Sequence, residues 1–170
     1  MGLQWYVLRS KPNKELALWR ELTARGLESF YPQLRVQPVN PRSRKIRPYF
    51  PGYLFLHMDI GQVGSSTLWW MPFSSGLVAF DGLPATVPDN LIQAIRRRVD
   101  EVNAAGGEQF VGLQPGESVV IQGGPFDGYE AIFDTCLTGN ERVRVLLKLL
   151  RMRQINLELP AAQIQRKKKR

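Results

Sequence analysis

The stretch RPYFPGYLFLHMD, Arg47–Asp59, decides how this chain folds. A turn-forming Pro-Gly pair precedes an apolar run, Tyr53–Leu56, which is typical of a β-strand. Side chains alternate along a strand, so Tyr53 and Phe55 share one face. A buried strand prefers Val and Ile to such rings. The residues alone leave two interpretations of this face open: a core, which long apolar faces usually form, or a docking surface.

The residues on either side of this strand predict an α+β fold with helices packed against an antiparallel sheet. Alternating apolar residues indicate the strands, and apolar residues three or four apart indicate the helices. Pro32 interrupts one strand, which places that strand at an edge. The expected elements are, in order, a strand over 4–10, a helix over 12–26, a strand over 28–39, the strand 52–58, a short helix over 62–72, a strand over 75–82 and a helix over 87–105.

The pattern changes after residue 103, which ends the first predicted domain, 1–103. Two glycines among polar neighbours predict a linker over 104–114. Short strands separated by GGPFDG and TGN then predict a small β-barrel over 115–165. The basic tail RKKKR covers 166–170. The predicted fold class is therefore an α+β domain followed by a small barrel.

One part of the predicted barrel, RVRVLLKLL at 142–150, fits a helix and a strand equally well. The helical stripe is Val143, Leu146, Leu147 and Leu150, and the strand face is Val143, Val145, Leu147 and Leu149. The clean alternation in QINLEL favours strands. Pro125 would also break a helix carried through GGPFDG, at a cost of roughly 3 kcal/mol. We therefore expect a constitutive barrel on a flexible linker, one that leaves Tyr53 uncovered.

Composition excludes several classes of function. With one Cys and one His the chain has no Cys/His zinc set and no internal disulfide. No apolar run approaches the roughly 18 residues of a membrane span, and no signal-peptide pattern is present. No catalytic triad, phosphate-binding loop or paired-carboxylate motif appears either. We expect a cytoplasmic protein that is not an enzyme, with no catalytic residues, no metal and no cofactor.

The distribution of charge leaves two interpretations of the basic tail open: a nonspecific contact with nucleic acid, or a tail that only keeps the chain in solution. The net charge is +8, and five of the positive charges lie in the C-terminal tail. A second basic cluster, PRSRKIRP at 41–48, lies between two prolines beside the opening stretch. We interpret it as a loop or hairpin tip that is well placed to contact phosphates.

Three stretches resemble the NusG family of transcription elongation factors. WYVLRSKPNKE resembles the family's opening strand and helix, FPGYLFLHM its signature strand, and GESVVIQGGPFDGYEAIF the KOW motif of its carboxy-terminal barrel. The KOW turn would be Gly123, Gly124, Pro125 and Phe126. Ala131, where family members commonly have Gly, and the Leu-rich C-terminal end look more like the specialised RfaH-like paralogs.

The resemblance implies a non-enzymatic, monomeric factor that binds RNA polymerase and suppresses pausing or termination. Tyr53, Phe55 and Phe80 would dock on the clamp helices of the polymerase, and Ser65, Ser66 and Thr67 would touch the opposite pincer. Contacts to upstream or nontemplate DNA would come from Lys11, Arg42, Arg44, Lys45, Arg47, Ser74 and Ser75. Ser74 and Ser75 stand where RfaH-like proteins that recognise the nontemplate strand carry a basic residue, so base-specific recognition by this route is not implied. The barrel would recruit a small-subunit ribosomal protein or Rho.

Two alternatives remain open at this point. KOW barrels also occur in ribosomal proteins, so a ribosome-associated or RNA-binding protein is the second hypothesis. A ribosomal KOW protein has no need of FPGYLFLHM, however. RfaH-like proteins also raise the possibility that the C-terminal segment folds as a helical hairpin that masks the polymerase site. The strand patterns described above favour the barrel.

Overall fold

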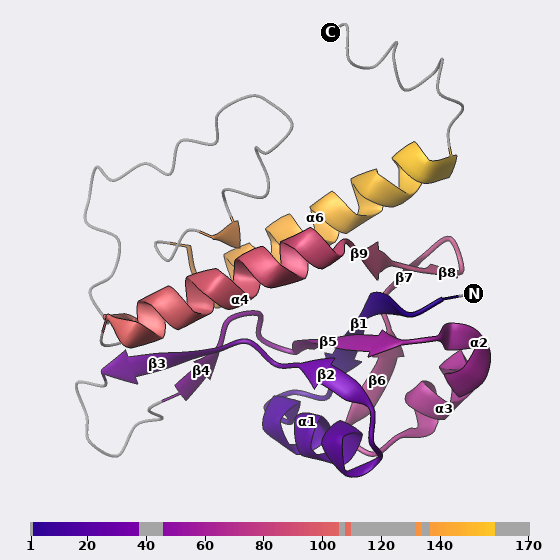
Figure 1. The fold of residues 1–170 in the computed structure, drawn as a ribbon, viewed down its shortest axis with the longest axis horizontal. Helices are drawn as coiled ribbons and strands as arrows, with labels where there is room; N and C mark the ends of the chain where they lie inside the picture. Colours follow the sequence, from indigo (N-terminus) through magenta and orange to yellow (C-terminus); the bar gives the residue numbers. More distant parts are fainter. Residues whose placement is uncertain (1, 38–45, 106–107, 110–131, 134–136, 159–170) are drawn as a thin grey trace, which may run out of the picture.

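The computed structural model describes residues 2–37, 46–105, 108–109, 132–133 and 137–158. Its centre is a five-stranded antiparallel sheet in the order β2-β5-β1-β6, with β9 also pairing with β1 (Figure 1). These strands are β1 (Gln4–Ser10), β2 (Glu28–Phe30), β5 (Tyr53–Met58), β6 (Ser74–Leu77) and β9 (Thr86–Val87).

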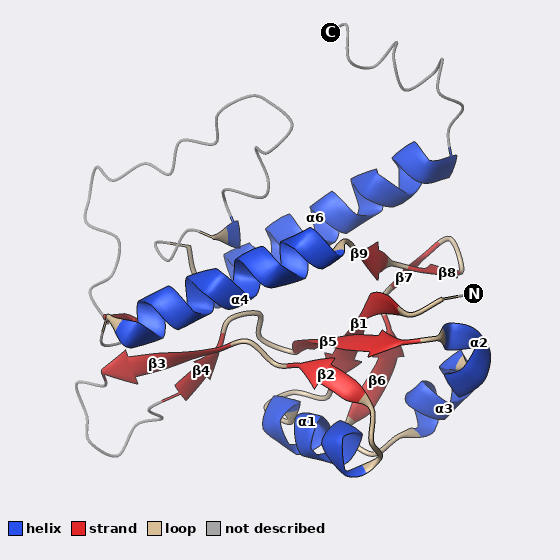
Figure 2. Cartoon of the chain, viewed as in Figure 1, coloured by secondary structure: helices blue, strands red, loops and turns tan. Residues whose placement is uncertain are grey.

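Helices cover both faces of this sheet (Figure 2). One face carries α1 (Glu15–Ala24) and α3 (Ser65–Trp70), preceded by the short α2 (Ile60–Val63); the other carries α4 (Asp89–Ala104) and α6 (Gly139–Glu158). We call the two cores the α1-side core and the α4-side core. The α1-side core is Tyr6, Leu8, Leu18, Leu22, Leu54, Leu56, Met58, Leu68 and Met71. The α4-side core includes Trp5, Val7, Tyr49, Phe50, Phe55, Ile92, Ile95, Leu146 and Leu150.

Smaller sheets flank the main one. Strands β3 (Gln33–Gln37) and β4 (Ile46–Pro48) form an antiparallel pair, and β10 (Glu108–Gln109) adds to β3 in parallel. Strands β7 (Ala79–Phe80) and β8 (Leu83–Pro84) make a short hairpin. Because β10 lies inside the predicted linker 104–114, two residues of that segment are paired with β3.

The sequence pattern predicts the first hundred residues well. The expected strand over 28–39 divides into β2 and β3 around Pro32, which supplies no N–H to a ladder. Gly52 has a φ of +85°, which is accessible to glycine and strained for other residues, and it turns the chain into β5. Burial raises the pKa of Tyr6 in the α1-side core, and nearby Asp59 adds to the rise.

The predicted barrel strands over 142–150 and 154–159 are wrong for this structure, because residues 139–158 form α6. Of the two apolar patterns in this segment, the helical one is used. Leu146 and Leu150 are fully or almost fully buried, while Val143 and Leu147 are partly buried. Alternation in QINLEL and the helix-breaking Pro125 favour strands in the sequence. The α4-side core, on which the helical stripe packs, is formed mostly by residues distant in sequence.

Candidate functional site

The three rings predicted to dock a partner contribute to one core. Phe55 is fully buried, while Tyr53 and Phe80 are partly buried against the same α4-side core. Along the β1–β5 ladder Phe55 lies opposite Val7 and Tyr53 opposite Arg9. Tyr53 and Phe55 therefore share a face, as strand alternation predicts. In this structure Phe55 is a core residue, and Tyr53 and Phe80 keep part of their surface exposed.

Helix α6 lies against the same core. Leu146 and Leu150, one helical turn apart, are buried in the α4-side core together with Phe55. Fully burying a Leu side chain contributes about 1.5–3 kcal/mol, so this stripe is a substantial part of what holds α6 in place. The expectation that the C-terminal segment would leave this face uncovered is therefore wrong for this structure.

The buried side chain of Arg142 anchors the first turns of α6. Only 1% of Arg142 is exposed. Its Nε donates to the carbonyl oxygen of Tyr49 at 2.9 Å, and an Nη donates to the carbonyl oxygen of Leu137. The guanidinium carbon lies 4.3 Å from the centre of the Tyr49 ring. A planar guanidinium suits this combination of carbonyl acceptors and an aromatic face, which an ammonium group would not reproduce.

The Tyr49 side chain extends this anchor, because its hydroxyl donates to the carbonyl oxygen of Ile132. Tyr49 itself is fully buried, and its ring meets Phe50 edge-on at 4.9 Å between centroids. One residue of the segment preceding β5 therefore contacts two separate parts of the chain beyond α4.

The start of α6 is capped and fits closely against the turn that precedes β5. The backbone N–H of Thr138 donates to Glu141 Oε2 at 3.0 Å, and that of Glu141 donates to Thr138 Oγ1 at 3.2 Å. This reciprocal pair is a capping box. A Cβ added at Gly139 would lie 2.6 Å from Cγ of Pro51. A side chain at position 139 would therefore push α6 away from the turn.

The other end of α6 reaches the β7–β8 hairpin. The side-chain amide of Gln154 donates to the carbonyl oxygens of Leu83 at 3.2 Å and Phe80 at 3.5 Å. The backbone of Phe80, one of the three candidate docking residues, is therefore in contact with α6.

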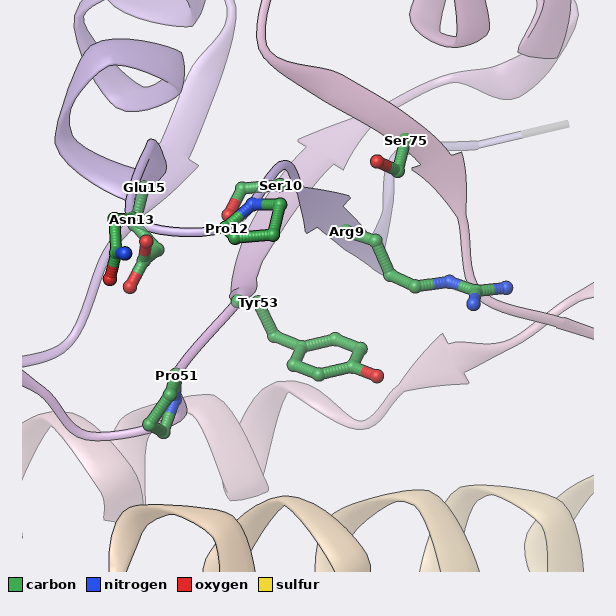
Figure 3. A pocket seen from close by; sticks show the side chains of 9 residues that line it. Arg9, Ser10, Pro12, Asn13, Glu15, Pro51, Tyr53 and Ser75 are labelled. Carbon is green, nitrogen blue, oxygen red and sulfur yellow. The ribbon is translucent and has the colours of Figure 1, made fainter.

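A pocket of about 440 Å³ opens beside Tyr53 (Figure 3). It brings Tyr53, a predicted polymerase contact, together with Ser75, a predicted DNA contact, and with the end of β1. The residues that line it are Arg9, Ser10, Pro12, Asn13, Glu15, Pro51, Gly52, Tyr53 and Ser75.

The predicted DNA contacts occupy different environments. Lys11 is exposed in the turn between β1 and α1, and its backbone N–H donates to the carbonyl oxygen of Phe73 at 2.8 Å. Ser74 is buried, and its hydroxyl accepts a hydrogen bond from the N–H of Gly76 at 3.0 Å. Lys11 is thus presented to solvent, whereas the Ser74 hydroxyl already serves the backbone.

Arg47 lies near the start of α6. It is partly buried in β4 and lines a second pocket, of about 370 Å³, together with Thr138, Gly139 and Asn140. Three further predicted contacts fall outside the described residues: Arg42, Arg44 and Lys45. The predicted KOW turn, Gly123, Gly124, Pro125 and Phe126, also lies outside them.

The hydroxyl-rich tripeptide lies on a different helix from the docking rings. Ser65, Ser66 and Thr67 form the first turns of α3 and are all exposed. Leu68, the next residue, is fully buried in the α1-side core. These hydroxyls therefore lie on the helix that packs on the α1-side core, whereas the rings pack on the α4-side core.

Sequence reasoning missed Arg142 and the cap that precedes it. The tetrapeptide TGNE, Thr138–Glu141, matches the capping-box pattern, which predicts a helix start at this position. It was interpreted as a turn between strands. Within the described residues no group of three or more His, Cys, Asp or Glu side chains forms a metal site, and no helix has the length and hydrophobicity to cross a membrane.

Comparisons with known proteins point in one direction. Residues 3–96, more than half of the chain, match the family model described as transcription termination factor nusG. The chain is 25% identical to the transcription termination/antitermination protein NusG of Pseudomonas aeruginosa, over 98% of this chain and 99% of that protein. It is 19% identical to the protein of the same description from Borreliella burgdorferi, over 88% and 91%.

A similar solved structure is described as a domain interaction in Thermotoga maritima NusG. The similarity covers 74% of this chain and 76% of the chain in that structure, with 23% sequence identity and a TM-score of 0.45.

Proposed function

The chain belongs to the NusG family of transcription factors, and on this premise we propose that it binds RNA polymerase and opposes pausing or termination during elongation. The proposed docking surface is the face with Tyr53, Phe55 and Phe80. The observation that carries this proposal is that these rings, two from β5 and one from β7, pack on one core. Aromatic residues concentrated in this way bury much area for few rotatable bonds, as interface hot spots do.

In the same proposal α6 is an intramolecular cover for the docking surface, and the clamp helices of the polymerase replace it. The cover is supported by the burial of Leu146 and Leu150 with Phe55, and by the carbonyl contacts of Arg142. An occluded face of this kind fits a specialised, RfaH-like member of the family rather than a general one.

We assign the released C-terminal segment to the KOW barrel over 115–165, joined through residues 104–114. The support is the second apolar pattern of residues 142–150, which makes a strand face as readily as the helical stripe. A small barrel would then offer a surface to a ribosomal protein or Rho. In this scheme the chain is a monomer, and its basic tail, 166–170, lies beyond the barrel.

Contacts to upstream or nontemplate DNA complete the proposal. Lys11 is exposed, and Ser75 lies on the wall of the pocket beside Tyr53. The basic cluster at Arg42, Arg44, Lys45 and Arg47 would add phosphate contacts, each reducing log affinity by about 0.9 per log unit of salt on duplex DNA.

The test uses a fragment that contains the polymerase clamp helices. In a Leu146→Glu/Leu150→Glu variant of the full chain, buried carboxylates should expel α6, because an unpaired charge is costly in an apolar core. We expect this variant to bind the fragment, and an added Tyr53→Ala to weaken binding about tenfold or more. Leu16→Ala, at an exposed apolar residue of α1, is the matched control and should leave affinity unchanged. Equal affinity with and without Tyr53 would refute the docking assignment.

A further inference from the structure

Two tryptophans at the end of α3 are largely exposed. Trp69 is 59% and Trp70 is 80% exposed, and neither belongs to the two cores. Side chains of this size are usually highly buried, so an adjacent exposed pair calls for a partner.

The Trp69 ring is held in position although it is exposed. A Cβ added at Gly76 would lie 2.4 Å from Cε3 and 2.8 Å from Cζ3 of this ring. Gly76 also has a φ of +88°, which favours glycine. The ring therefore packs directly on the β6 backbone and keeps more than half of its surface open. Because the Trp69 side chain is already held in place, stacking of a partner on its ring would cost little rotamer freedom.

The surroundings of this ring are neutral on one side and cationic on the other. Residues 60–80 contain no Asp, Glu, Lys, Arg or His. The adjoining turn SKPNK, Ser10–Lys14, contains two cations, Lys11 and Lys14, and no carboxylate, whereas Arg9 before it shares the face of Tyr53 on the α4 side. The two stretches are joined by the hydrogen bond from the Lys11 N–H to the Phe73 carbonyl oxygen and by the pairing of Ser10 with Ser74.

Open aromatic rings beside a row of cations are the arrangement that binds single-stranded nucleic acid, because unstacked bases present flat π-faces and the backbone presents phosphates. We propose that Trp69 stacks on a base of a single nucleic-acid strand whose phosphates pass along the Lys11–Lys14 turn, with Trp70 as a neighbouring ring. This inference rests on the proposed DNA contact at Lys11 and Ser75 and adds to it a residue that contacts bases. Stacking tolerates any base, so it does not require a basic side chain at position 74 or 75 to recognise a particular base.

The location has a consequence for the free protein. Trp69 follows Leu68, which belongs to the α1-side core, whereas α6 packs on the α4-side core. The stacking surface is therefore on the side of the sheet that α6 does not cover. The full chain binds a single strand through it without polymerase and without release of α6.

The experiment measures binding of the full chain to three labelled probes at low salt: an oligothymidylate, an abasic strand of the same length, and a hairpin duplex. Trp69→Ala should weaken oligothymidylate binding about tenfold, since aromatic stacking is worth roughly 1–3 kcal/mol per base, and should leave the abasic strand unaffected. Trp69→Phe should lose only about twofold. Lys11→Ala should weaken all three probes, because phosphates are common to them. Leu16→Ala is the control for loss of an exposed apolar side chain.

The outcomes separate the two proposals. Stacking would be overturned if Trp69→Ala had equal effects on the oligothymidylate and abasic strands, or no effect on either. It would also be overturned if the parent chain failed to bind oligothymidylate. Loss of stacking with a retained Lys11 effect would leave the proposed DNA contact standing. If Trp69→Ala instead weakened binding of DNA-free polymerase, the ring would be a protein contact and the inference would be wrong.

Discussion

The two faces of the main sheet are covered in different ways. On the α1 side, each covering helix contacts the strand that follows it in the chain: α1 contacts β2, and α3 contacts β6. On the α4 side, half of the cover is α6, which begins at Gly139, far along the chain from β5. The buried residues of the first core all lie between Tyr6 and Met71. The second depends on a segment whose residues also fit another structure.

The contacts at the two faces differ in kind as well. Apart from its apolar stripe, α6 is held by the directional bonds of Arg142, by the close approach of Gly139 to Pro51 and by the Thr138 cap. Directional and close contacts are sensitive to single changes, whereas loss of one methyl group from an apolar core is partly absorbed by relaxation. We therefore expect α6 to be separable from a domain that stays folded.

The largest expected contrast comes from the same substitution on each side. Leu18→Ala, in the α1-side core, should lower the free energy of unfolding of the whole domain by about 2–5 kcal/mol. Leu146→Ala, equally buried in α6, should instead reduce hydrogen-exchange protection of residues 139–158 and leave the β1–β5 amides protected. Comparable loss of β1–β5 protection in both variants would show that α6 is an integral part of the domain.

Arg142→Ala should release α6 to a smaller extent. The change leaves the carbonyl oxygens of Tyr49 and Leu137 without this donor, at a cost of about 2–3 kcal/mol for a charged hydrogen-bond donor. Exchange of the α6 amides should therefore accelerate about 30- to 150-fold. Arg142→Lys should rescue little, because an ammonium lacks the planar fork. The control is Arg144→Ala at an exposed position of the same helix, and an equal effect there would contradict the anchor.

Gly139→Ala tests the close approach to Pro51. The added methyl group meets Pro51 Cγ at 2.6 Å, so docking of α6 should weaken by about 1–2 kcal/mol. Alanine is the better helix former, so the free helix should not be weakened. Asn140→Ala, at the exposed next residue, provides the comparison. Amide exchange across α6 reports both, and a stabilising effect of Gly139→Ala would show that the contact is not tight.

Thr138→Ala should have the smallest effect, about 1 kcal/mol, through loss of the N-cap. Thr138→Ser keeps the hydroxyl oxygen and should restore most of the protection. The effect should be confined to the first turn of α6, and exchange measured at the Glu141 amide checks it. Unchanged exchange at that amide in Thr138→Ala would show that the Thr138 cap does not stabilise the first turn of α6.

The sequence predicts the α1 side well and the α4 side only in part, for a physical reason. The helices around the α1-side core contact the strands that follow them in the chain, as α1 contacts β2 and α3 contacts β6, so apolar period and turn residues predict these elements. Residues 142–150 carry two periods, and only burial in the α4-side core, formed mostly by residues far away in sequence, selects the helix. The capping box at Thr138–Glu141 was the local signal for that choice.

The candidate site shows the same limit. Tyr53 and Phe55 were placed on one face by strand alternation, and that placement is confirmed. Their cover was not predicted, nor was Arg142, because an arginine in an ambiguous segment gives no sign that it will be buried against Tyr49. The position of Trp69 was equally hidden, because the apolar pattern does not show that its ring lies against the backbone at Gly76 and not in a core.

We propose that α6 and the polymerase clamp helices compete for the face that carries Tyr53 and Phe55. The direct measurement follows carbon chemical shifts of residues 139–158 in the full chain as a clamp-helix fragment is added. We expect helical chemical shifts in the free chain. These shifts should be lost in proportion to the fraction of the chain that has bound the fragment. Helical shifts that persist at saturation, with the fragment bound to Tyr53, would contradict it.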